Sequence, residues 1–171
     1  MDVRLYIKDL VYGANDGIIT TFAIVAGVVG AGLSVRAVLI IGFASLLADG
    51  FSMAASSYLG GRSERAAFAN AKMDMGDSSF NKNPLVSGLF TFVAFIGAGL
   101  FPLLPYLFVM EEAKLFLYAA IATAAALFII GALRTLVTGR HFIVAGIEML
   151  IIGGIAAVIA YMTGYFVSTL F

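Results

Sequence analysis

The chain has 171 residues, of which 62% are hydrophobic and only 12% charged, and its mean hydropathy is +1.06. A soluble domain of this size does not need so much apolar surface, so the composition indicates a protein that crosses a membrane several times. The formal net charge of zero gives no reason to expect a nucleic-acid partner, and the absence of cysteine excludes disulfides and thiolate metal sites.

Charged residues divide the chain into five predicted spans, at about residues 10–33, 37–60, 84–108, 114–134 and 142–170. Each is long enough to cross a hydrocarbon core of about 30 Å as a helix. Helices are expected because loops this short do not build a barrel, and backbone groups in lipid must be satisfied internally. No signal-peptide cleavage site precedes the first span, so we expect that span to remain. The sequence predicts one all-α transmembrane domain, residues 1–171.

Lysine and arginine residues predict how the spans are oriented. Eight of the ten fall on one side: Arg4, Lys8, Arg62, Arg65, Lys72, Lys82, Arg134 and Arg140. Only Arg36 and Lys114 fall on the other. Because basic loops stay in the cytosol, we expect a cytosolic N-terminus and a C-terminus outside the cell or in an organelle lumen.

The longest aqueous segment, residues 61–83, is expected to lie in the cytosol. Residues 63–75 could prolong the second helix beyond the membrane. Pro84 suits the first turn of the third helix, while Pro102 and Pro105 should bend or stop that helix at its far end.

Two carboxylates, Asp16 and Asp49, lie within apolar spans. An acid at the centre of a membrane helix costs about 2.5–3.5 kcal/mol on insertion scales and usually marks an ion or proton path. Met53 follows Asp49 by one helical turn, and a carboxylate with a thioether can bind a soft-to-borderline divalent metal. Met53 is equally well explained as a packing residue.

Helical periodicity puts each acid on a polar or small-residue stripe. The first stripe is Tyr12, Asp16, Thr20, Ala23 and Gly27. The second is Ser45, Asp49, Ser52, Met53 and Ser56. Both should face protein or a water-filled path rather than lipid, and Gly13 and Gly17 should allow a second helix to approach beside Asp16. The alternative is that the acids only hydrogen-bond neighbouring helices, but Ser or Asn would do so at less cost.

Other polar residues are weaker candidates. Glu148 lies two turns inside the last span, where pairing with Arg134 or Arg140 is slightly favoured over a role in an ion path. The segment from Met73 to Asp77 is read as a solvated loop rather than a metal-capture patch. His141, the only histidine, is read as an interface residue. Nothing resembles a catalytic constellation or a phosphate loop, so we expect no enzyme and no permanently bound cofactor.

One chain offers few metal ligands, namely Asp16, Asp49, Met53 and Asn15. An Fe²⁺ or Mn²⁺ site usually has about six donors, counting water. A two-fold homodimer with the path near its axis would double the set, and two-fold symmetry is the commonest.

Several motifs together resemble the vacuolar iron transporter family. In the first two spans they are Gly13-Ala14-Asn15-Asp16-Gly17 and Ala48-Asp49-Gly50-Phe51-Ser52-Met53. In the later spans they are Pro102-Leu103-Leu104-Pro105-Tyr106, Gly131-Ala132-Leu133-Arg134, Thr138-Gly139-Arg140 and Glu148-Met149. The resemblance covers nearly the whole chain.

The resemblance implies a five-helix homodimer that moves Fe²⁺, and often Mn²⁺, out of the cytosol in exchange for protons. The acid and the methionine that line the path in that family match Asp16 and Met53. Well-known members carry a membrane glutamate where this chain has Ser45, so Asp49 is the candidate for its role. They also carry an acidic metal-binding insert between spans two and three, for which residues 61–83 are too few; a nodulin-like branch also lacks it.

The sequence therefore predicts an exporter of Fe²⁺ or Mn²⁺ coupled to protons, with Asp16, Asp49, Met53, Asn15 and Glu148 as candidate metal-path residues. We expect it in a prokaryotic cell membrane rather than an organelle membrane. One alternative is a path for protons or another cation without a metal role. The other is a non-transporting membrane scaffold whose acids fasten helices together.

Overall fold

A computed structural model describes residues 3–71, 82–108, 112–135, 139 and 141–171, and these residues contain helices and no strand. The α-helices are α1 (Ile7–Gly30), α2 (Val35–Ala71), α3 (Pro84–Gly99), α4 (Leu104–Phe108), α5 (Leu115–Leu133) and α7 (Phe142–Leu170). Short 3₁₀ helices are η1 (Val3–Tyr6), η2 (Phe101–Leu103) and η3 (Glu112–Lys114).

Five segments of the described chain are helical, long and apolar enough to cross a membrane: α1, α2, α3 continued through α4, α5 and α7. This confirms the all-α membrane class predicted from the sequence. The helices begin and end within a few residues of the predicted spans, except that α2 continues to Ala71. The expected prolongation of the second helix past residue 60 is thus confirmed as far as Ala71.

Local sequence explains where the third span begins and breaks. The Asn83 side chain accepts a hydrogen bond from the backbone N–H of Leu85 at 3.0 Å, and Pro84 occupies the first turn of α3. Proline is tolerated there because the first turn's N–H groups have no helical partner. At the other end α3 stops at Gly99, and Pro102 and Pro105 lie in η2 and α4, as predicted.

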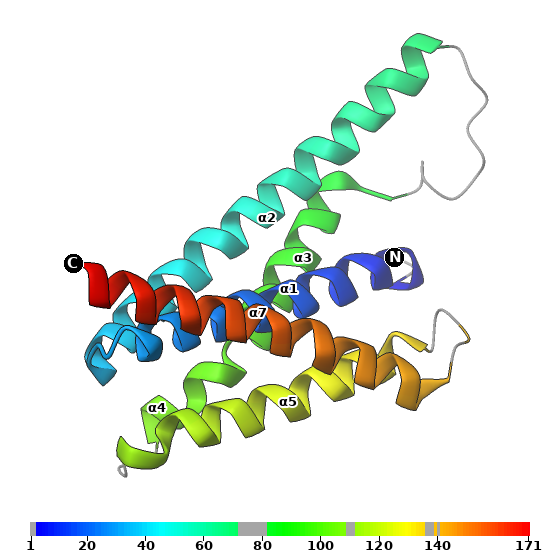
Figure 1. Ribbon diagram of the computed structural model, residues 1–171. Helices are drawn as coiled ribbons and strands as arrows, with labels where there is room; N and C mark the ends of the chain where they lie inside the picture. Colours follow the sequence, from blue (N-terminus) through cyan, green and yellow to red (C-terminus); the bar gives the residue numbers. More distant parts are fainter. Residues whose placement is uncertain (1–2, 72–81, 109–111, 136–138, 140) are drawn as a thin grey trace.

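Helix α1 is the centre of the bundle and packs against α2, α3, α5 and α7 (Figure 1). Its glycines allow the closest contacts: Gly17 lies on the backbone of Phe95 in α3, and Gly30 lies on the backbone of Tyr161 in α7. A side chain at either position would collide with backbone atoms that cannot rotate away. The predicted close approach beside Asp16 is confirmed, and the partner is α3.

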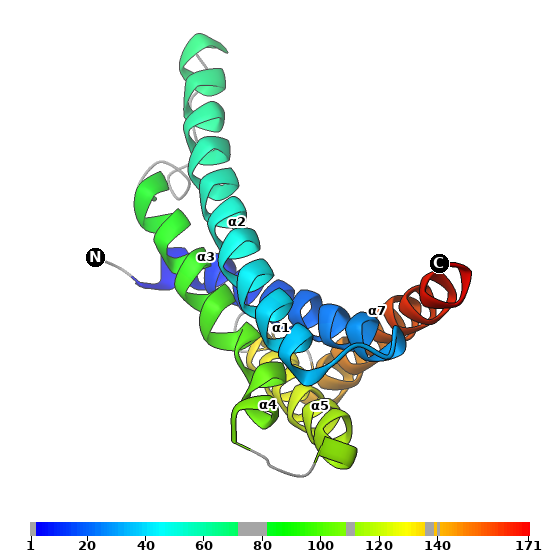
Figure 2. The ribbon, with the colours of Figure 1, turned by 90° about the vertical axis from the view of Figure 1, so that its left-hand side faces the viewer.

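The ends of the helices group as the predicted orientation requires. The starts of α1, α3 and α7 and the ends of α2 and α5 lie toward one end of the bundle (Figure 1). The α1–α2 turn, α4 and the C-terminus lie toward the other. Figure 2 shows α2 extending well beyond its neighbours at the first end. The side of the membrane on which each end lies remains a prediction from the positive charges.

Candidate functional site

Each membrane acid is followed by a glycine, and both glycines contact Phe95 of α3, Gly17 its backbone and Gly50 its side chain. A Cβ on Gly17 would collide with the backbone oxygen of Phe95. A Cβ on Gly50 would lie 3.1 Å from Ile96 Cδ1 and 3.2 Å from Phe95 Cδ1. Phe95 itself is fully buried. The shared support draws α1 and α2 together at the level of Asp16 and Asp49.

The structure therefore brings the two predicted acids into one region. The Asp49 carboxylate is near enough to act electrostatically on Asp16. When both are charged they repel each other, and in a low-dielectric environment that repulsion is only weakly screened. A proton or a cation between them removes the repulsion, so the pair is chemically suited to exchange one for the other.

Asp16 is half-buried on α1 and sits in a polar turn. Thr20 Oγ1 donates a hydrogen bond to the Asp16 backbone oxygen at 2.7 Å. The Asp16 carboxylate takes no part in this bond. The neighbouring Asn15 has a buried Oδ1 with no hydrogen-bond partner. A buried oxygen without a donor is costly, and it is therefore available to a proton donor or a cation.

Asp49 lies on the surface of the single chain, with Ser52 and Ser56 exposed beside it along α2. Tyr12, on the stripe of α1 that contains Asp16, is also 66% exposed. The prediction that both stripes face protein or water is thus not met on α2 by contacts within one chain, whereas Asp16, Thr20, Ala23 and Gly27 of the α1 stripe are half-buried. A carboxylate facing lipid would be expensive, so this face requires a cover of protein or water.

Met53 lies one turn beyond Asp49 and is half-buried against the main hydrophobic cluster, which includes Leu46 and Phe95. Met53 therefore has a packing role in addition to its position one helical turn after Asp49. Its geometry is compatible with both interpretations made from the sequence.

Glu148 forms an ion pair that joins α7 to the end of α5. Its Oε2 is 2.8 Å from Arg134 Nη2. Both side chains are partly exposed. This ion pair is the structural role that the sequence slightly favoured, and it leaves Glu148 the weakest of the five candidates. The segment from Met73 to Asp77 lies outside the described residues.

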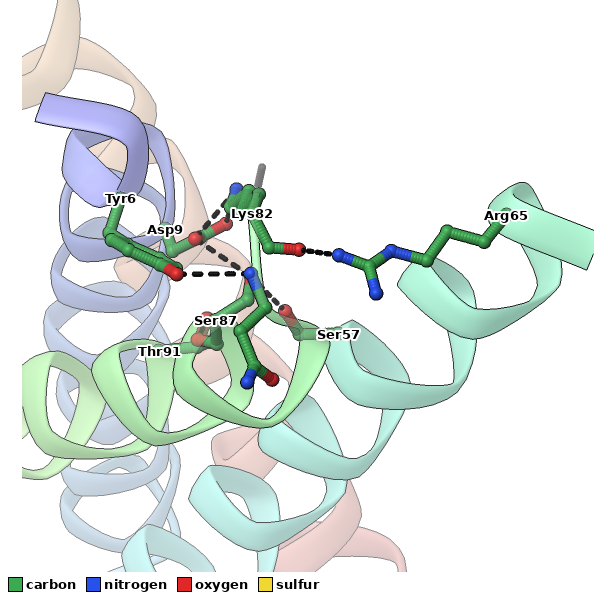
Figure 3. Close-up of polar contacts among 8 residues, drawn as sticks. Tyr6, Asp9, Ser57, Arg65, Lys82, Ser87 and Thr91 are labelled. Carbon is green, nitrogen blue, oxygen red and sulfur yellow. Dashed lines mark hydrogen bonds and ion pairs between the residues drawn. The ribbon is translucent and has the colours of Figure 1, made fainter. Parts of the chain in front are cut away.

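Sequence reasoning missed a polar cluster at the end of the bundle that holds the N-terminus (Figure 3). We call it the Asp9 cluster; its members are Tyr6, Asp9, Ser57, Lys82 and Ser87. Asp9 binds Lys82 Nζ at 2.7 Å and accepts a hydrogen bond from Ser87 Oγ at 2.7 Å. The four-residue spacing of Asp9, Gly13 and Gly17 could have indicated that Asp9 shares a helix face with the two glycines. It was not used because the first span was predicted to begin at about residue 10.

The described residues contain no group of three or more His, Cys, Asp or Glu side chains placed to hold a metal. The candidate donors of one chain are two acids, one amide oxygen and one thioether. A divalent cation usually has more donors than this set provides, and the contribution of a second copy remains a prediction.

The fold defines a helical membrane protein with several spans, and two acids lie within those spans. Comparison with known proteins gives the family. The model of the VIT family matches residues 7–78 and 69–165, which together cover most of the chain, so the chain belongs to the VIT family.

Several similar proteins are named vacuolar iron transporters, and their sequence identity to this chain varies. A vacuolar iron transporter of Toxoplasma gondii is 50% identical over 60 residues, which are 35% of this chain and 20% of that protein. One of Centaurea cyanus is 26% identical over 208 aligned positions, covering 91% of this chain and 85% of the relative. Vacuolar iron transporter 1 of Tulipa gesneriana is 23% identical, with 91% and 84% covered.

The alignments also bear on the segment between α2 and α3. At 208 positions they exceed the length of the chain, so these relatives have residues with no counterpart here. The two pieces of the family match meet at residues 69–78, inside the segment where we expect the missing insert. The names of the relatives refer to vacuoles and thus do not favour the expected prokaryotic cell membrane.

Proposed function

We propose that this protein exports a divalent metal, Fe²⁺ or Mn²⁺, from the cytosol in exchange for protons, through a path that passes Asp16 and Asp49. The observation that carries the proposal is the shared support of the two acids: the glycines that follow Asp16 and Asp49 both contact Phe95, Gly17 its backbone and Gly50 its side chain. Membership of the VIT family and the names of its relatives support iron as the cargo.

The donor atoms suit this cargo. Two carboxylates and the unpartnered Asn15 oxygen are hard ligands that any divalent cation accepts. Met53 adds a sulfur that Mg²⁺ and Ca²⁺ decline, so it would favour the transition metals. A proton competes with the metal for the same carboxylates, which provides the coupling between the two fluxes.

The active unit we propose is a two-fold homodimer. Asp49, Ser52 and Ser56 are exposed on one chain and need a polar or protein environment within the membrane. A second copy against this face would cover the stripe and would double the donors around the path.

Reconstitution into liposomes tests the proposal. Liposomes containing the protein should take up Fe²⁺ or Mn²⁺ at a rate that depends on an imposed pH gradient, and uptake should move protons the opposite way. A pH-driven proton flux that ignores the metal would favour the simpler cation path. Absence of both fluxes would favour the scaffold.

A further inference from the structure

The Asp9 carboxylate is bound on both of its oxygens. Lys82 Nζ lies 2.8 Å from Oδ1 and 2.7 Å from Oδ2, and Ser87 Oγ donates to Oδ2 at 2.7 Å (Figure 3). The Asp9 side chain is only 12% exposed and that of Lys82 24%. Charge-assisted bonds in a partly buried place are stronger than those of a solvated surface pair.

Further contacts tie three helices at the same point. The Tyr6 hydroxyl accepts a hydrogen bond from the Asn83 backbone N–H at 3.0 Å, and the hydroxyls of Ser57 and Ser87 are 3.1 Å apart. Arg65 of α2 donates to the Lys82 backbone oxygen. The residues that lead into α3 are therefore held by both α1 and α2.

This cluster is the polar end of the α1–α3 contact. Asp9, Gly13 and Gly17 follow one another at four-residue intervals on α1 and meet Ser87, Thr91 and Phe95, which have the same spacing on α3. The Thr91 backbone oxygen would be 2.5 Å from a Cβ on Gly13. The third of these contacts, Gly17 on Phe95, is the one that supports the acid pair.

We propose that Asp9 is a positioning residue. Its bonds to Lys82 and Ser87 clamp α1 to α3 in the register that sets Asp16 beside Asp49. The proposal rests on the proposed function, because positioning matters only if the acid pair carries the cargo. The other end of α1 is held independently, by Gly30 on Tyr161 of α7, so the clamp governs the N-terminal half of α1 and not the whole fold.

Distance measurements test the clamp directly. The chain has no cysteine, so spin labels attach only where cysteine is introduced. Labels at Lys8→Cys and Leu85→Cys, both exposed, report the separation of α1 and α3 beside the cluster. Labels at Leu33→Cys and Phe101→Cys, also exposed, form the control pair at the far end. Asp9→Ala should broaden the first distance distribution and leave the second unchanged. An unchanged first distribution would overturn the clamp.

Transport tests the consequence for the acid pair. Asp9→Ala should lower the maximal rate of metal flux by about fivefold, with Asp9→Asn intermediate, because small misplacements of a reacting group are costly. Lys82→Gln should behave like Asp9→Asn. Lys8→Gln is the matched control, since it removes a neighbouring exposed charge outside the cluster, and it should transport normally.

Rescue separates positioning from a general loss of folding. The exchange Asp9→Lys with Lys82→Asp restores the ion pair and should recover most of the rate, while the thermal midpoint stays close to that of the wild type. Full activity of Asp9→Ala with a broadened distance would refute positioning. If the wild type carries no metal, the proposed function fails, while the distance measurement still decides whether Asp9 clamps α1 to α3.

Discussion

Two faces of the bundle carry small and polar residues, and the structure uses them in opposite ways. Between α1 and α3, Gly13 and Gly17 let the backbones touch, and the polar Asp9 is satisfied by Lys82 and Ser87. On α2, the polar stripe of Asp49, Ser52 and Ser56 remains exposed on the single chain. The first face holds α1 and α3 together. The second carries polar side chains that no other part of the same chain covers.

The difference teaches where function is to be sought. Where the small residues of a stripe are in contact with the backbone of a neighbouring helix, helix packing alone explains why they are small. A stripe that leaves a carboxylate uncovered in a membrane segment costs free energy until a cation, a proton, water or another subunit meets it. Asp16 lies between these two faces, next to the packed Gly17 and within electrostatic reach of the exposed Asp49.

The largest effect should follow from removing the charge between the two faces. Asp16→Asn matches the acid in size but cannot carry the exchanged charge, so we expect metal flux to be abolished while the protein remains folded and keeps the oligomeric state of the wild type. Flux in liposomes and size-exclusion chromatography measure both. Normal transport by this variant would make Asp16 a packing residue.

Adding a side chain at the close contact between α1 and α3 should have the next largest effect. Gly17→Ala places a methyl group against the Phe95 backbone oxygen, which cannot rotate away, and should cost about 1–3 kcal/mol of stability. Gly97→Ala is the matched control on α3, since nothing lies within 4 Å of its Cβ. Unfolding of the two variants in detergent gives the comparison. Equal stability would show that the α1–α3 contact is looser than described.

Removing only the sulfur beside the open face should have a smaller effect. Met53→Leu preserves volume and apolarity, so stability should fall by less than about 1.5 kcal/mol. We expect weaker transport of Fe²⁺ or Mn²⁺ and poorer rejection of Mg²⁺, because the softer donor is lost. Competition between Mn²⁺ and Mg²⁺ in the flux assay measures this. Unchanged selectivity would assign Met53 to the hydrophobic cluster alone.

The smallest effect is expected outside both faces. Replacing Asp74 and Asp77 together by Asn should change transport by less than about twofold, because three acids spread among four basic residues concentrate cations only weakly. Initial rates against metal concentration at one pH give the result. A large loss of maximal rate would reveal a metal-capture site between α2 and α3.

The sequence predicted the helices well because charged residues mark where each span leaves the apolar environment. Pro84, Pro102 and Pro105 placed the start and the break of the third span for the same kind of local reason. Pairing of Glu148 with Arg134 also followed from their positions at neighbouring helix ends. Each of these features depends on residues close together in the chain or on charge alone.

What the sequence did not reveal depends on how helices face one another. The spacing of Gly13 and Gly17 predicted a close helix contact beside Asp16, but it could not show that Gly17 and Gly50 both contact Phe95 of α3. The clamp at Asp9 was missed because its partners, Lys82 and Ser87, are more than seventy residues away. Their meeting requires the register of α1 against α3, which emerges only when the helices pack.

The central claim is that Asp16 and Asp49 form one site, and a double-mutant cycle tests it most directly. Binding of Mn²⁺ would be measured by titration calorimetry for the wild type, Asp16→Asn, Asp49→Asn and the double variant. If the carboxylates share one cation, the double variant should lose little more affinity than the weaker-binding single variant, with a coupling of about 1–3 kcal/mol. Strictly additive losses would mean that the two acids act independently and would contradict the account.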